Sequence, residues 1–205
     1  MKANEIIREG DRIGTALWKS SIPAKYKQYP VIGQGATSVV LDKGDGNVIM
    51  LTRDEMKRDW LVHDWGLGIG DWVDSFDASH RQSRDLSDMP VYVIVLPKLF
   101  PLSKENKRVV KKVIEEYNKI AFHGTRNMMD ALNNYLNQHP EGLLAQIAEF
   151  LRNYDEKQFN VDFIMRNFMQ DANGKIVLVD PIVSSQIIDA LHQISKQRYE
   201  RKGMW

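Results

Sequence analysis

The chain of 205 residues is 43% hydrophobic and carries a formal net charge of +1. It has room for one medium domain or two small lobes, and its charge predicts no specific nucleic-acid partner and no membrane attraction. It contains no cysteine, which excludes disulfides, thiolate metal sites and thiol nucleophiles. The first eight residues lack the apolar block of a signal peptide, and the longest apolar run, residues 91–96, is too short to span a bilayer. We therefore expect a cytoplasmic protein.

The first half of the chain predicts a small antiparallel sheet with one helix. Apolar runs on either side of the turn Lys43-Gly-Asp-Gly46 indicate strand, turn and strand. Gly66 and Gly68 end the helix that follows. The expected elements are a helix over 2–19 within an extension of residues 1–28, a hairpin over 30–52, a helix over 53–65, and strands at 72–76 and 91–96. Residues 29–97 are expected to form one lobe.

The second half changes to helical periodicity, and residues 98–205 predict a reduced, mostly helical lobe. The expected helices cover residues 109–120, 126–138, 143–154 and 185–201. Two short apolar strands flank the turn Asp171-Ala-Asn-Gly174, within a segment of residues 160–181. The fold class is therefore α+β, with the sheet first and the helices after it.

Residues 33–40 contain a glycine pattern, Gly33-Gln34-Gly35-x-x-Ser38-x-Val40. Dinucleotide-binding folds use a related pattern to open a helix, whereas here a strand and a turn follow. The chain contains no Gly-Lys-Ser/Thr, which excludes a Walker-type phosphate loop. Glycines on a hairpin let backbone amides approach phosphates, because no Cβ stands in the way. The alternative is a hairpin that needs glycine only for its turns.

Three polar residues near the C-terminus have the spacing of a phosphotransfer site. Asp162 is followed by Asn167 five residues later and by Asp180 thirteen residues after that. In kinase catalytic loops, one carboxylate faces the attacking hydroxyl, and an amide oxygen and a second carboxylate hold Mg²⁺. The alternative is ordinary turn chemistry beside a hairpin, since Asp and Asn also favour turns.

Together these motifs resemble a bilobal protein-kinase-like fold, and more narrowly the early serine/threonine protein kinase of short-tailed, T-seven-like bacteriophages. The resemblance spans residues 29–185. It implies ATP and Mg²⁺ as cofactors and bacterial host proteins as substrates. It also assigns roles: Asp162 as base or hydroxyl-orienting residue, Asn167 and Asp180 as Mg²⁺ ligands, and Gly33, Gln34, Gly35 and Ser38 as phosphate contacts. Further expected nucleotide contacts are Val40, Val48 and the hinge residues Pro97 and Leu99.

Two positions depart from the kinase pattern. Met50 stands where kinases carry a lysine that pairs with the nucleotide phosphates, and residues 44–56 contain no lysine. Loss of such a charge costs on the order of 3 kcal/mol of transition-state stabilisation, about a hundredfold in rate. Either a lysine was deliberately replaced, or the natural protein is a weakened kinase. Ile164 occupies a second position that usually holds a lysine or histidine, and Arg166 is a candidate substitute.

These departures leave two alternatives to an active protein kinase. A non-catalytic pseudokinase that binds nucleotide or a host partner would need neither cation. A small-molecule phosphotransferase of the aminoglycoside-kinase type shares the Asp-x4-Asn pattern and the final Asp. Such enzymes usually carry histidine two residues after the first Asp, where Ile164 stands.

Overall fold

The computed structural model describes residues 22–35, 37–64, 66–78, 84–122, 143–154 and 158–201. It has a mixed α+β architecture, as expected from the sequence. The helices predicted over 2–19 and 126–138 lie outside the described residues. The chain divides into two compact units. Unit 1 contains residues 1–58, 70–97 and 186–205, and unit 2 contains residues 59–69 and 98–185. No helix in the described part of the chain combines the length and apolar character needed to cross a membrane.

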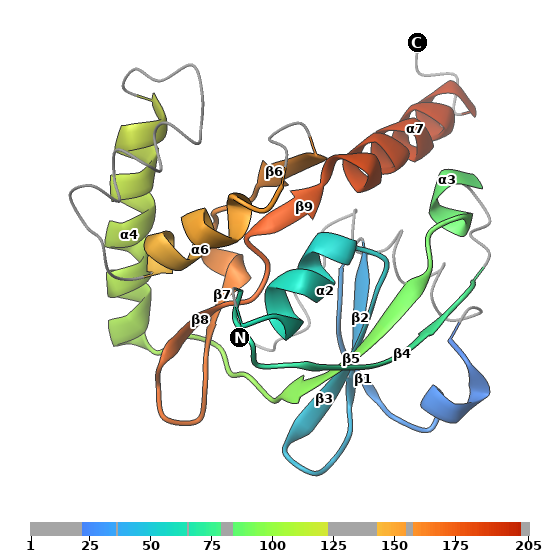
Figure 1. Ribbon diagram of the computed structural model, residues 1–205, viewed down its shortest axis with the longest axis horizontal. Coiled ribbons are helices and arrows are strands. Elements are labelled where there is room, and N and C mark those ends of the chain that lie inside the picture. Colours follow the sequence, from blue (N-terminus) through green and yellow to red (C-terminus); the bar gives the residue numbers. More distant parts are fainter. Residues whose placement is uncertain are drawn as a thin grey trace. The chain divides into compact units, whose positions relative to one another are not determined.

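Unit 1 is built on a five-stranded antiparallel sheet, which confirms the predicted sheet (Figure 1). Its strands are β1 Val31–Gln34, β2 Ser38–Asp42, β3 Asn47–Thr52, β4 Asp71–Phe76 and β5 Val91–Pro97, in the spatial order β1-β2-β3-β5-β4. The β2–β3 turn forms as predicted because Gly44 and Gly46 adopt φ angles of 86° and 84°, which glycine adopts at little steric cost. The Asp42 carboxylate accepts the Gly44 amide hydrogen at 3.0 Å and closes the turn.

The two faces of this sheet differ in character. Alternate residues of the central strands form an apolar cluster on one face, because strand side chains alternate with a period of two. Its members are Ile22, Tyr26, Val39, Leu41, Ile49, Leu51, Ala78, Val91 and Val93. On the other face the register places Ser38 opposite Thr52 and Val40 opposite Met50. That face carries Ser38, Val40 and Val48, three of the residues predicted to contact nucleotide.

Arg53 fastens the end of β3 to the segment that joins β4 and β5. Its guanidinium donates hydrogen bonds to the carbonyl oxygens of Ala78, Leu86 and Met89, and the residue is only 5% exposed. Burial lowers the pKa of Arg53 to about 10, so the group is still cationic at neutral pH. A planar cation with several donors can satisfy three carbonyls together, which gives Arg53 a structural role.

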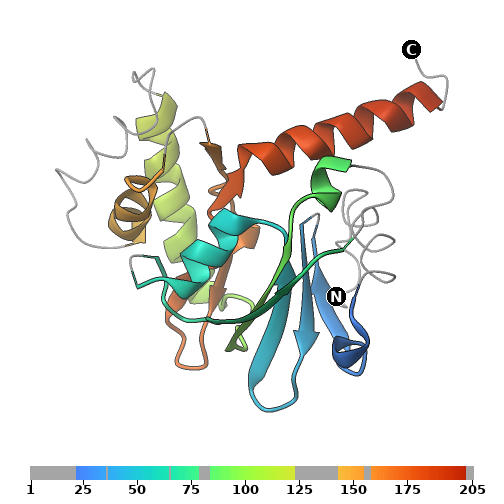
Figure 2. The same ribbon diagram turned by 45° about the vertical axis from the view of Figure 1, so that its right-hand side comes forward.

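The last helix, α7 (Ser185–Arg201), packs on α3 (Arg84–Ser87) in unit 1 (Figure 2). Buried Ala190 and Ile194 meet Leu86, with Met89 and Leu191 packed at the side. The helix itself covers the predicted residues 185–201. The sequence grouped it with residues 98–205, whereas its residues from 186 onward belong to the compact unit that contains the sheet.

Unit 2 combines helices with two small antiparallel sheets. The helices are α4 Lys104–Phe122 and α6 Leu143–Leu151, and the strand pairs are β6 Phe159–Val161 with β9 Ile182–Ser184 and β7 Phe168–Gln170 with β8 Ile176–Leu178. A short 3-10 helix, η3 Met165–Asn167, precedes β7. Helix α4 is longer than predicted, and it exposes Val109 (46%) while burying Val110. The buried apolar face of α4 is therefore narrower than the sequence pattern predicted.

Helix α2 (Glu55–Val62) is shorter than the predicted helix over residues 53–65. In unit 2, buried Trp60 donates its indole N–H to the carbonyl of Leu178 at 2.7 Å and meets the Phe150 ring edge-on. Gly66 is required here, because a Cβ at this position would lie 2.4 Å from the Trp60 carbonyl oxygen. Trp72, by contrast, is 50% exposed, and the Arg58 guanidinium lies over its ring.

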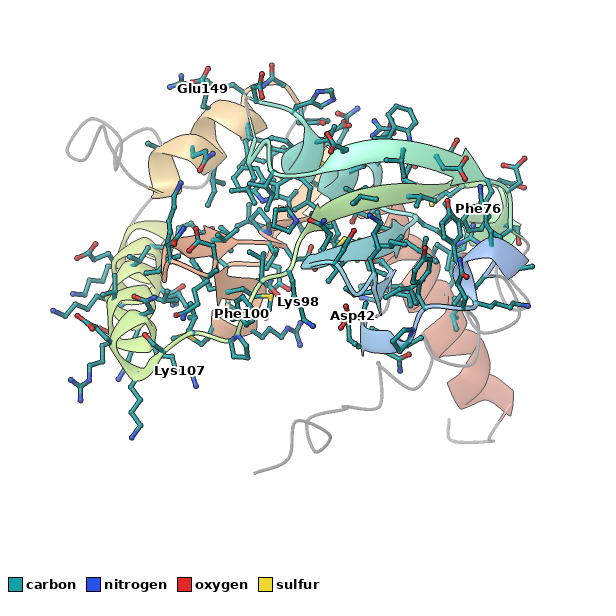
Figure 3. The ribbon with its side chains drawn as sticks, turned by 90° about the horizontal axis from the view of Figure 1, so that it is seen from below. Asp42, Phe76, Lys98, Phe100, Lys107 and Glu149 are labelled. Atoms are coloured by element: carbon teal, nitrogen blue, oxygen red, sulfur yellow. The ribbon has the colours of Figure 1, made fainter. Side chains whose placement is uncertain are left out.

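The start of α4 is tied to the β7–β8 hairpin. Phe100 and Gln170 exchange two backbone hydrogen bonds of 2.8 and 2.9 Å. The Gln170 side chain accepts hydrogen bonds from the Ser103 amide and the Asn106 side chain, each at 2.8 Å. Figure 3 labels Phe100, together with Lys107 in the first turns of α4. These bonds hold the β7–β8 hairpin against the start of α4.

Candidate active site

Backbone hydrogen bonds bring the three predicted polar residues of unit 2 together. The Asp162 amide donates to the carbonyl of Pro181 at 2.8 Å, and the Val179 amide donates to the carbonyl of Asn167 at 2.8 Å. Residues 179 and 181 are the immediate neighbours of Asp180. The chain at Asp180 therefore runs between the two residues that start and end the Asp-x4-Asn loop. The backbones of the three residues therefore lie on neighbouring segments, and their shared role stays a prediction.

Asn167 links the two ends of the loop through its side chain. The residue is only 6% exposed, and its Nδ2 donates to the carbonyl oxygen of Asp162 at 2.6 Å. This bond fixes the orientation of the amide, so Oδ1 points away from the Asp162 carbonyl. Within the described structure Oδ1 makes no hydrogen bond of its own. An oriented amide oxygen of this kind can serve a hard cation.

The two carboxylates differ in exposure and in their partners. The Asp162 side chain is 34% exposed, and its single ion pair, with Arg166, is long at 3.5 Å. In Asp180, the Oδ1 atom is buried and accepts no hydrogen bond from the described residues, although the side chain takes part in other interactions. Arg166 is itself 67% exposed, so its contact with Asp162 contributes little.

Asn167 and Asp180 offer one amide oxygen and one carboxylate. Mg²⁺ commonly takes one or two such oxygen ligands and completes its shell with water and substrate phosphates. Among the described residues no group of three or more His, Cys, Asp or Glu side chains could hold a metal ion.

Three aromatic rings pack together beside Asp162, in tilted and edge-on contacts. Phe163, the residue after Asp162, is 5% exposed and lies between Tyr117 of α4 and Phe168 of β7, with ring centroids 4.9 and 5.1 Å apart. Burial raises the pKa of the Tyr117 hydroxyl above its usual value. The packed Phe163 ring holds the neighbouring Asp162 in position.

The glycine hairpin lies in unit 1, and its amides are less available than the sequence suggested. Gly33 and Gln34 pair with Val40 and Val39 in the β1–β2 ladder, and the Gly35 amide donates to the Ser38 carbonyl at 2.8 Å. Neither Gly33 nor Gly35 has a positive φ angle, and a Cβ on Gly35 would meet nothing within 4 Å. The fold itself therefore does not require glycine at position 35.

The remaining predicted nucleotide contacts occupy both units. Val48 and Met50 are buried on the sheet face that also carries half-buried Val40. Pro97 is the exposed last residue of β5, and half-buried Leu99 follows in unit 2. The role of these residues in nucleotide binding stays a prediction.

Sequence reasoning missed one residue of this region, Lys57. The kinase pattern places its lysine on β3. Residues 44–56 contain no lysine, and Lys57 is the third residue of the next helix. Its ammonium lies 3.1 Å from the Ser38 hydroxyl of the glycine hairpin. The pattern Thr52-Arg-Asp-Glu-Met-Lys57 contains a signal for it, because a lysine in the first turn of a helix directly after a strand can reach back to that strand's end.

Comparisons with protein-family models, with curated proteins and with solved structures found no match. The chain is thus assigned to the α+β class on its own geometry, and its function has to be inferred from the residues just described.

Proposed function

We propose that this protein is a Mg²⁺- and ATP-dependent phosphotransferase of the protein-kinase-like type, as in the phage kinases it resembles, acting on serine or threonine hydroxyls of bacterial host proteins. One observation supports the proposal: two backbone hydrogen bonds connect the Asp162–Asn167 loop to the residues on either side of Asp180, and a third bond, within the loop, orients the Asn167 amide. Turn chemistry alone would not require the Asn167 amide to be buried and fixed.

Each residue has a defined task in this proposal. Asn167 Oδ1 and the Asp180 carboxylate would hold Mg²⁺, which offsets charge on the nucleotide phosphates when bound. Asp162, which is partly exposed and only weakly paired, would accept the proton of the attacking hydroxyl or orient that hydroxyl. The resemblance assigns phosphate contacts to the glycine hairpin, and Arg166, whose side chain is 67% exposed, is the candidate cation beside Asp162.

A second function, a non-catalytic protein that binds nucleotide, is favoured by specific residues. Met50 is buried and uncharged at the position of the expected lysine, and Ile164 is an apolar residue with 36% exposure beside Asp162. Neither supplies the positive charge that stabilises a transferring phosphoryl group. This function predicts nucleotide binding without transfer.

The test has a binding stage and a transfer stage. Thermal unfolding with ATP and MgCl₂ should raise the melting temperature, because a ligand that binds only the folded state stabilises it. Incubation with γ-labelled ATP and bacterial lysate should then label proteins, and Asp162→Asn should lower labelling by about a hundredfold or more while ATP still shifts the melting temperature.

The matched control is Asp45→Asn, a carboxylate in the β2–β3 turn, which should label as the unchanged protein does. Nucleotide binding with no transfer would point to the non-catalytic function. Transfer to small molecules but to no protein would point to a metabolite phosphotransferase. Absence of any ATP-dependent shift would overturn the proposal.

A further inference from the structure

A buried lysine lies against the glycine hairpin. Lys57, in the first turn of α2, is only 6% exposed, and its Nζ donates to the Ser38 hydroxyl at 3.1 Å and to the Thr37 hydroxyl at 3.4 Å. Buried lysines are rare, because removal of the ammonium from water is costly unless polar groups surround it. Its position therefore calls for an explanation.

The hydroxyls around this ammonium form a directed chain. Ser38 Oγ accepts from Lys57 and donates to Thr52 Oγ1 at 3.0 Å, and Thr52 Oγ1 donates to the Thr37 carbonyl at 3.4 Å. The Thr37 carbonyl also accepts the Arg53 amide hydrogen at 3.3 Å. The hairpin tip is thus tied to the end of β3, with the lysine ammonium beside it.

The lysine ammonium reaches the sheet face that carries Met50. Ser38 pairs with Thr52 and Val40 pairs with Met50, and residues two apart on a strand share a face. The Ser38 hydroxyl that Lys57 contacts is therefore one cross-strand pair from Met50, about 7 Å along the strand. Strand β3 carries no lysine on this face, and Lys57 of α2 brings an ammonium to the same face of the sheet.

Several described backbone donors near this hairpin already have acceptors. The Gly35 amide is bonded to the Ser38 carbonyl, and the amides of Met56 and Lys57 in the first turn of α2 are capped by the Asp54 carboxylate at 3.1 and 3.3 Å. The Gly35 amide is therefore not the phosphate donor that the glycine pattern alone indicated.

We propose that Lys57 is the phosphate-binding cation of this protein and takes the place of the lysine that β3 lacks at Met50. The inference rests on the proposed nucleotide-dependent function. Its ligand is the polyphosphate of a nucleoside triphosphate, held by the lysine ammonium and the hairpin hydroxyls. Lys57 therefore binds phosphate through charge, where the sequence pattern alone indicated glycine amides.

The first test is covalent labelling of the intact protein with an acyl-phosphate derivative of ATP. A lysine beside the bound phosphates loses one proton from its ammonium to solvent, and the amine Nζ attacks the acyl carbon. An amide bond forms, the bond from that carbon to the phosphate oxygen breaks, ATP leaves, and a second proton passes from Nζ to solvent. Peptide mass spectrometry should find the acyl group on Lys57, and excess Mg²⁺–ATP should suppress it. Labelling of other lysines that ATP suppresses, with Lys57 unlabelled, would overturn the inference.

The second test uses three variants and calorimetric titration with ATP and with adenosine. Lys57→Met keeps the side-chain length and removes the charge, and it should weaken Mg²⁺–ATP binding at least tenfold while adenosine binding changes less than twofold. Adding Met50→Lys to Lys57→Met returns an ammonium to the same sheet face and should restore most of the ATP affinity. Lys43→Met, an exposed lysine paired with Asp45, is the matched control and should bind as the unchanged protein does.

The outcomes separate the two proposals. If the unchanged protein binds Mg²⁺–ATP and folded Lys57→Met binds it equally well, Lys57 has only the structural task of fixing the hairpin hydroxyls, and the proposed function stands without it. If Lys57→Met does not fold, the labelling experiment on the unchanged protein decides. If the unchanged protein binds no ATP and takes no label that ATP suppresses, both proposals are wrong.

Discussion

At the scale of single residues, the sequence predicted contacts between residues that lie close together along the chain. Asp162 and Asn167 lie in one loop, so their separation of five residues already implies a local contact, and the structure shows it as the Asn167–Asp162 hydrogen bond. Lys57 could not be found in this way. Its long side chain reaches a hydroxyl 19 residues away in sequence, and only the fold shows that contact.

Asn167→Ala tests the residue that holds the loop together. The variant removes a buried hydrogen bond and leaves the Asp162 carbonyl without this donor, which should cost about 1–3 kcal/mol of unfolding free energy. Urea unfolding measures the loss. Asn173→Ala is the matched control, because Asn173 is exposed and uses its backbone amide, retained in alanine, to bond Asp171. Its unfolding free energy should change by less than about 0.5 kcal/mol; equal losses in both variants would contradict the structural role of Asn167.

At the scale of elements, local patterns predicted most helices and strands, while their ends and exposed faces depended on partners. The β2–β3 hairpin follows from its glycines and alternating apolar residues. By contrast, Trp72 is exposed because it lies on β4, an outer strand of the sheet, where its ring meets Arg58 and Tyr92. Aromatic composition alone does not distinguish an edge position from a core position.

Tyr117 on α4 provides a test of how this helix supports the Asp162 loop. Burial raises the folded-state pKa of its hydroxyl, so above pH 10 the unfolded state loses this proton before the folded state does. The unfolded state then binds fewer protons, and the unfolding free energy falls as pH rises. Tyr117→Phe removes this contribution while it retains the contact with Phe163.

Urea unfolding at a series of pH values measures the effect. Tyr117→Phe and the unchanged protein should differ little at pH 8, and the variant should gain relative stability steadily above pH 10. A stability difference that is independent of pH would show that the Tyr117 hydroxyl is not buried beside the loop.

At the scale of the whole molecule, the units are built from chain segments that are distant in sequence. Unit 1 contains α7, whose residues follow residues 98–185 of unit 2 in the chain, and unit 2 also contains residues 59–69, which interrupt unit 1. The apolar stripe of α7 predicted that this helix buries one face. It did not identify the partner of α7, because an apolar stripe indicates which face of a helix is buried but not which residues cover it. The contact of Ala190 and Ile194 with Leu86 joins residues about a hundred positions apart in the sequence.

Ile194→Ala tests the membership of α7 in unit 1. Ile194 is 2% exposed and packs with Leu86 and Ala190, so its truncation should cost about 2–4 kcal/mol of unfolding free energy through lost burial and a cavity. Amide hydrogen exchange followed by mass spectrometry should show faster exchange in α7 and α3. His192→Ala, an exposed position on the same helix, should exchange as the unchanged protein does. Faster exchange confined to residues 159–184, with α3 unchanged, would instead assign this helix to unit 2.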